Sequence, residues 1–216
     1  AFPELEQQFH DRLAELNDAR DHLRRCNTGG EFMSPQTQER IRQIAAYHWI
    51  GPDGQECAFL SEDEIANLCI AKGTLNPTER AIIEEHVALT MQMLKTLPWP
   101  TTLRNVPEYA GCHHEKLDGS GYYRHLSGPQ LSVPARIIAL ADVFEALTAA
   151  DRPYKSGKPL SEVLKILGQM VRDHEIDPDL FDVFIRNDVW LDYARQYLQP
   201  EQIDAVNPGQ IPGYTP

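Results

Sequence analysis

The sequence predicts an all-α protein, in which a helical bundle follows an N-terminal helical arm. Three observations predict this class. Apolar residues recur at intervals of three, four and seven, the spacing that marks one face of a helix. Helix-start signals recur along the chain, whereas no segment of useful length alternates apolar and polar residues as a half-buried strand does. The sequence also lacks a repeat of 20–50 residues, which argues against a solenoid.

The arm is expected over residues 1–30, as a helix or a coiled-coil insertion. Its apolar residues form a narrow stripe within a charged segment: Leu5, Phe9, Leu13, Leu16 and Leu23. Such a stripe is typical of a coiled-coil strand rather than of a buried core helix. Because a helix gains most of its stability from packing, we expect the arm to contact a partner helix. That partner is a segment upstream of Ala1 or a second copy of the chain, which would make a homodimer.

Start and stop signals position the remaining helices. Ser61 and Glu64 form a predicted capping box. Asn76, Pro77 and Glu79 suit the cap, first and third positions of the next helix, which ends at a proline. A glycine-containing loop is expected at 117–132 and a disordered tail at 207–216, which holds three prolines and two glycines. The expected main domain covers 31–206, with helices at 35–49, 61–70, 77–97, 107–115, 134–150, 160–173, 178–187 and 189–206.

The net charge of −12 argues against a general nucleic-acid binder, because neutralising many phosphates requires a basic surface. An acidic chain can still bind a small anion where bound metal ions reverse the local field. The four cysteines form no C-x-x-C pair, which fits a reducing compartment, and we expect a cytoplasmic protein. We expect no membrane segment and no signal peptide. The chain begins at Ala1 within a charged helical pattern, which indicates an internal cut in a longer protein.

Three histidines and one aspartate are candidates for a metal site. Adjacent residues diverge by about 100° on a helix, so His113 and His114 could point toward two ions of one cluster, although such pairs also occur by accident. His86 shares a helix face with several apolar residues and is expected to point inward, as a ligand or as a hydrogen-bonded core residue. Asp142 lies in an apolar helix, where a carboxylate needs an arginine, a backbone cap or a metal ion as partner. Imidazoles and a carboxylate suit iron, manganese or zinc.

The segment H-H-E-K-L-D-G-S-G-Y-Y at residues 113–123 closely resembles the signature of the HD-GYP family, H-H-E-x-x-D-G-x-G-Y-P. The resemblance continues through A-R-I at 135–137, A-D-V-F-E-A-L-T at 141–148 and D-R-P-Y-K at 151–155, and it reaches back to His86. In all it covers residues 61–187. It implies a helical bundle of the HD-domain type with metal ligands at His86, His113, His114 and Asp142.

The resemblance further implies a signalling phosphodiesterase that linearises cyclic di-GMP with a hydroxide held by two or three divalent metal ions. Iron or manganese is favoured for these ions, with zinc as the alternative. Arg152, Lys155 and Tyr122 match positions that contact the ligand in the family. Asp118 is expected to hold the glycine-containing loop through side-chain bonds to the backbone. Two other functions stay open: hydrolysis of a different nucleotide phosphate, and a non-catalytic receptor or interaction module that uses the same pocket.

Two departures from the family pattern affect these expectations. Tyr123 stands where the signature has proline. The His-Asp pair that names the family should precede His86 on an apolar helix, but His10-Asp11 lies instead in the charged arm. We therefore expect the pair upstream of Ala1, in a parent protein. The chain by itself is then expected to hold metal weakly and to hydrolyse cyclic di-GMP little or not at all.

Overall fold

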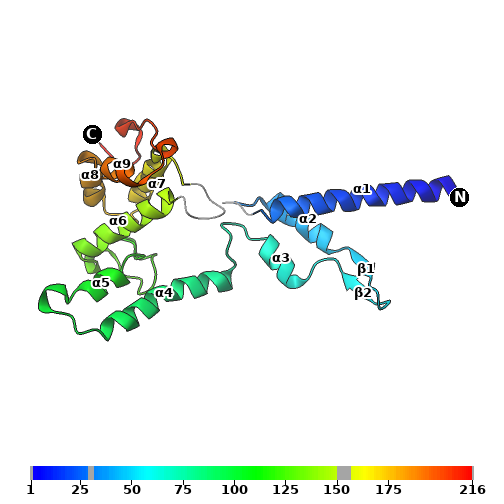
Figure 1. Ribbon diagram of the computed structural model, residues 1–216, viewed down its shortest axis with the longest axis horizontal. Coiled ribbons are helices and arrows are strands. Elements are labelled where there is room, and N and C mark those ends of the chain that lie inside the picture. The colour runs from blue at the N-terminus through cyan, green and yellow to red at the C-terminus, as the bar shows by residue number, and fades with distance from the viewer. Residues whose placement is uncertain (1, 29–31, 150–156, 216) are drawn as a thin grey trace. The chain divides into compact units, whose positions relative to one another are not determined.

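A computed structural model describes residues 2–28, 32–149 and 157–215. Helices dominate these residues, which confirms the predicted all-α class (Figure 1). Contacts divide the chain into two units, Ala1–Ala81 and Ile82–Pro216. The division therefore lies near residue 81 and not at the expected end of the arm near residue 30. One reason is an ion pair of 3.0 Å between Asp18 of the arm and Arg40, which joins the arm to the segment that follows it.

The first unit contains α1 (Phe2–Cys26), α2 (Pro35–Ala45), β1 (His48–Ile50), β2 (Glu56–Ala58) and α3 (Glu62–Leu68). The side chain of Ser34 caps α2, and the predicted capping box of Ser61 and Glu64 opens α3. Ala19, Ile41 and Ile44 are fully buried in this unit. All residues from 2 to 15 of α1 are exposed, so only the C-terminal half of the arm is packed.

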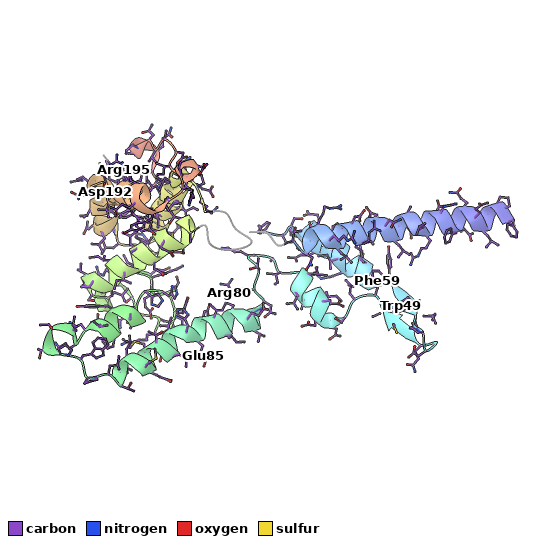
Figure 2. All side chains as sticks on the ribbon, viewed as in Figure 1. Trp49, Phe59, Arg80, Glu85, Asp192 and Arg195 are labelled. Atoms are coloured by element: carbon purple, nitrogen blue, oxygen red, sulfur yellow. The ribbon has the colours of Figure 1, made fainter. Side chains whose placement is uncertain are left out.

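A short hairpin replaces the end of the helix that was expected to run to residue 49. Strands β1 and β2 pair in antiparallel register, with Trp49 opposite Cys57. The turn between them contains Gly54 at a φ of +79°, a conformation that glycine adopts without strain. Trp49 and Phe59, both labelled in Figure 2, lie on and just after this hairpin. Hairpins of three residues per strand are too short to show a period-two pattern, so the sequence did not reveal this one.

The second unit is built around α6 (Val133–Thr148), α7 (Leu160–Arg172), α8 (Pro178–Arg186) and α9 (Val189–Tyr197). Helix α4 (Pro77–Lys95) and the short α5 (Val106–Gly111) precede them. Helix α6 packs against α5 on one side and against α7 and α8 on the other (Figure 1). Helix α7 buries one whole face, and its residues form the centre of the core: Leu160, Val163, Leu164, Leu167 and Val171.

The C-terminal segment packs against this core, which differs from the disorder expected for residues 207–216. A 3-10 turn (Pro208–Gln210) leads to Ile211, which is 5% exposed and belongs to the core cluster. The main chain at Pro212 lies so close to Gly168 that a Cβ on this glycine would meet the Pro212 oxygen at 2.2 Å. One apolar anchor and one glycine opposite it therefore hold a segment whose composition alone suggested disorder.

Candidate metal centre

Three imidazole rings converge at the junction of α4 and the turn after α5. His86 lies on α4, and His113 and His114 follow the end of α5. One ring nitrogen from each lies within 4.8 Å of the other two, a spacing that allows one metal ion to contact all three. His86 and His113 are 27 positions apart in the sequence, so the packing of α4 against α5 brings them together.

The two neighbouring rings do not diverge as they would on a helix. Helix α5 ends at Gly111, and His113 and His114 lie in a turn instead of in the helix expected up to residue 115. Their ring centroids are 4.0 Å apart and the planes are tilted by 41°. The pair was expected to point toward two ions of one cluster from a helix; in the structure both rings belong to one cluster, but a turn and not a helix positions them.

Backbone hydrogen bonds orient two of the rings. The Nδ1–H of His86 donates to the oxygen of Ile83 at 2.5 Å, and that of His113 donates to the oxygen of Ala110 at 2.6 Å. In this arrangement the proton sits on Nδ1, which leaves the Nε2 lone pair of each ring free. The two Nε2 atoms face each other at 3.2 Å. Two facing acceptors need a cation or a proton between them.

Among the described interactions, Asp142 of α6 contacts one of the three rings, that of His114. Its Oδ2 lies 3.3 Å from Nδ1 of His114. The pKa of His114 falls to about 4, because burial and the neighbouring His113 and His86 disfavour the charged ring more than Asp142 favours it. His114 is therefore neutral at pH 7 and keeps a lone pair for a metal ion.

The apolar residues of α4 lie differently from the expectation. Val87 and Met91 are the buried residues of this helix. Ile82 and Met93, which share the His86 side, are 64% and 66% exposed. The face of α4 that carries His86 was predicted to point inward, but it is exposed among the described residues. The opposite face is covered instead, because its Met91 packs against Gly111 of α5.

The loop after the histidines folds back onto them. The amide N–H of Tyr122 donates to the oxygen of His114 at 3.2 Å, and the Tyr122 ring lies 4.7 Å from the His114 ring at a tilt of 34°. A Cβ on Gly121 would stand 2.5 Å from the His114 oxygen, so this close approach requires glycine. Asp118 accepts a hydrogen bond from the Ser120 amide at 2.9 Å, which confirms its predicted role in holding the loop.

Glu115 is a structural element of this loop that the sequence did not identify. It is only 3% exposed, and its two carboxylate oxygens accept hydrogen bonds from the amides of Arg124 at 2.7 Å and Leu126 at 2.8 Å. These bonds tie the far end of the loop to the residue that follows the histidine pair. Its place as the third residue of the family signature was a signal, but no physical role could be read from that position.

Arg136 fastens the other side of the loop. Its guanidinium donates to the oxygens of Leu131 and Gly128 at 2.9 and 2.6 Å and pairs with Asp177 at 2.9 Å. The A-R-I segment of the sequence resemblance is therefore a structural clamp between the loop, α6 and the start of α8.

Two predicted ligand-binding residues, Arg152 and Lys155, lie outside the described residues. His10 and Asp11 lie in the exposed half of α1, within the first unit, where Asp11 accepts a hydrogen bond from Gln7 at 2.8 Å. None of their described interactions involves the three histidines.

Comparison with known proteins identifies the class. The family model described as the HD domain matches residues 62–180, more than half of the chain, so this chain belongs to the HD domain family. It is 42% identical over 127 residues to the 3'3'-cGAMP-specific phosphodiesterase 1 of Vibrio cholerae, which covers 59% of this chain and 27% of that protein. The predicted membership of the HD-GYP group is confirmed by these relatives and the signature.

Two further relatives carry related names. A probable cyclic di-GMP phosphodiesterase of Vibrio cholerae is 36% identical over 178 residues, 79% of this chain and 38% of that protein. The cyclic di-GMP phosphodiesterase of Thermotoga maritima is 31% identical over 119 residues, 55% of this chain and 32% of that protein. The chain thus spans between about a quarter and two fifths of the length of these relatives. Among the described residues, no helix is both long and apolar enough to cross a bilayer.

Proposed function

We propose that this chain supplies the metal-binding part of a cyclic-dinucleotide phosphodiesterase, with His86, His113, His114 and Asp142 as metal ligands. The observation that carries the proposal is the pair of Nε2 atoms facing each other at 3.2 Å while both Nδ1–H groups donate to backbone oxygens. This geometry leaves two acceptors without a donor between them. A divalent cation satisfies both at once, together with the neutral ring of His114.

The donor set suits iron, manganese or zinc. The family resemblance favours iron or manganese, with zinc as the alternative, and two or three ions in the complete domain. When bound, such ions lower the pKa of coordinated water and neutralise charge on the phosphate. The residues of the chain hold this centre in place. The backbone oxygens of Ile83 and Ala110 fix the two ring orientations, and Asp142 contacts His114 from α6.

The substrate class is a cyclic dinucleotide, cyclic di-GMP first. Support comes from the relatives, whose names specify cyclic di-GMP or 3'3'-cGAMP. Tyr122 is proposed as a substrate contact because its ring lies against that of His114. Arg152 and Lys155 are proposed as phosphate or base contacts.

Replacing Arg152 by alanine should weaken binding of cyclic di-GMP to the complete parent protein roughly tenfold or more, measured by calorimetric titration, with the thermal transition unchanged. Unchanged affinity would make Arg152 an ordinary surface charge.

The complete centre is proposed to need a His-Asp pair from elsewhere in the parent protein. Support comes from the exposed apolar residues beside His86 on α4, since a large uncovered apolar surface is usually an interface. An apolar helix that carries the pair would cover Ile82 and Met93 and bring its ligands to the histidines. We therefore expect the chain alone to bind metal incompletely and to turn over little substrate.

The direct test compares this chain with one extended upstream through the expected His-Asp helix of its parent. Metal content is measured by elemental analysis and turnover with cyclic di-GMP. The extended chain should hold more metal and show most of the activity, because positioning and electrostatic stabilisation depend on a full ligand set. Equal metal content and equal rates would refute the missing pair and return attention to His10 and Asp11. Tight binding without turnover by the extended chain would identify a receptor instead of an enzyme.

We also propose that the exposed half of α1 pairs with a second copy of the chain. Phe2, Leu5, Phe9 and Leu13 are between 45% and 86% exposed along one stripe. A solvated helix with so many large apolar side chains gains stability from a partner. Light scattering should give a dimer for the chain and a monomer after residues 1–15 are removed. A monomer in both cases would contradict the pairing.

The four cysteines are free thiols, in keeping with the cytoplasmic location that we propose.

A further inference from the structure

A cavity of about 180 Å³ lies between the C-terminal end of α6 and the end of α9. Both helices belong to the second unit, the same unit as the histidine cluster. Ala149 and Leu198 are the apolar residues of its lining, which otherwise consists of polar and aromatic side chains: Glu145, Thr148, Tyr193, Tyr197, Gln199 and Gln202. Such a lining suits a flat polar ring rather than an aliphatic ligand.

The cavity begins one helical turn from the candidate metal centre. Glu145 follows Asp142 by three residues on α6, so their Cβ atoms lie about 5–6 Å apart on neighbouring parts of one face. Ala149, seven residues after Asp142, lies about 10 Å farther along the helix axis. A ligand with its phosphate at the histidines could therefore extend one nucleotide along α6 and reach this cavity.

Two tyrosines form an aromatic wall. The ring centroids of Tyr193 and Tyr197 are 4.9 Å apart at 45°. Tyr193 is held by an edge-on contact of 5.4 Å with the buried Phe144, so its position is fixed by the core. Tyr197 is 67% exposed and leaves its ring accessible for stacking.

Glu145 supplies an acceptor that has no side-chain partner among the described residues. Its carboxylate has no hydrogen bond and no ion pair among the described residues. Burial raises the pKa of the Tyr193 hydroxyl, and the charge of Glu145 adds to this rise, which indicates that the carboxylate lies near the ring. The cavity thus combines a free pair of acceptor oxygens with an aromatic wall.

We propose that this cavity binds a guanine base of the substrate, an assignment that rests on the function proposed above. Guanine presents two adjacent N–H donors, N1–H and the exocyclic amino group, which match the two oxygens of the Glu145 carboxylate. Adenine presents an acceptor beside a donor, so one carboxylate oxygen would face a lone pair. The exposed ring of Tyr197 provides the stacking surface that every base can use. Glu145 therefore selects guanine, and Tyr197 contributes affinity for either purine.

The test measures equilibrium binding of GMP and of AMP to this chain by calorimetry. The chain should bind GMP roughly tenfold more tightly than AMP. Glu145→Gln should abolish this preference, because an amide offers one donor and one acceptor. Tyr197→Leu should weaken both nucleotides by roughly fivefold or more. Glu201→Gln, an exposed acid outside the cavity lining, is the matched control and should leave both affinities unchanged. Exposed positions such as Tyr197 and Glu145 tolerate these changes, and circular dichroism checks the fold.

Equal affinities for GMP and AMP in the unaltered chain, or an unaltered preference in Glu145→Gln, would overturn the guanine site. The two proposals fail separately. If the parent protein hydrolyses cyclic di-GMP with the same KM after Glu145→Gln, the guanine site is overturned and the proposed function is retained. The opposite result has two parts: the chain prefers GMP through Glu145, but the metal-loaded parent hydrolyses no cyclic dinucleotide. That result supports the guanine site and overturns the proposed function.

Discussion

Replacing Glu115 by alanine removes both acceptors that hold the end of the loop against the histidine pair. Its carboxylate is almost fully buried and receives two short bonds from the amides of Arg124 and Leu126. A hydrogen bond to a charged group contributes about 1.5–3 kcal/mol. Both amides are only partly buried, so the lower end applies, and the sum is about 3–4 kcal/mol. Glu115→Gln keeps one acceptor oxygen and should cost about half as much.

Two measurements check this magnitude. Urea denaturation followed by circular dichroism gives the loss of unfolding free energy, which is large beside the total of about 5–15 kcal/mol for a typical domain. Amide hydrogen exchange gives a local readout, because the Arg124 and Leu126 amides should lose protection when their acceptors disappear. Glu85→Ala is the control, since Glu85 is an exposed acid of α4 with no described side-chain partner (Figure 2). Retained protection of both amides in Glu115→Ala, with a stability change below about 0.5 kcal/mol, would refute the reasoning.

Three further predictions concern the cluster and the tail. His113→Ala should weaken binding of zinc to the chain at least about tenfold in calorimetry, because one of three nitrogen donors is lost, while His48→Ala in the first unit should have no effect. Ile211→Ala should cost about 2–4 kcal/mol in urea denaturation, since this side chain is buried in the core, and a cost near zero would mean that the tail is unpacked. The pKa of His114 is about 4 when folded and 6.5 when unfolded, so the unfolded chain takes up the proton first. Metal-free stability should therefore decline as the pH falls from 6.5 to 4, and His114→Gln should decline less; identical profiles would contradict the shift.

Local signals predicted most helices of the bundle well. The capping box of Ser61 and the Asn76-Pro77 start both lie where the structure begins α3 and α4. The apolar periodicity of residues 160–173 matches α7 within one residue. These features depend on neighbours three or four positions apart, so a single stretch of sequence contains all the information that they need.

The signature residues were also identifiable from the sequence, but their arrangement was not. His86, His113, His114 and Asp142 were predicted as ligands of one centre. The structure brings the three ring nitrogens within 4.8 Å of one another, and Asp142 lies 3.3 Å from the His114 ring without belonging to that group. The turn that contains the histidine pair was predicted as helix, because Pro107 is a helix-start signal and no local signal marks the end of that helix. That end depends on bonds made across the loop, such as those that Glu115 accepts from residues nine and eleven positions away.

The sequence by itself determined the helical class and the family, and it supplied the candidates for metal ligands, since all of these follow from composition, periodicity and spaced motifs. Only the tertiary structure decided which face of α4 is covered, that Glu115 is a buried anchor, and that Ile211 fills the core. Burial and long-range hydrogen bonding decide these features, and both depend on which surfaces meet in space. Periodicity showed that Ile82 and Met93 share a side with His86. Whether that side is inside or outside depends on a neighbour that no local pattern can specify.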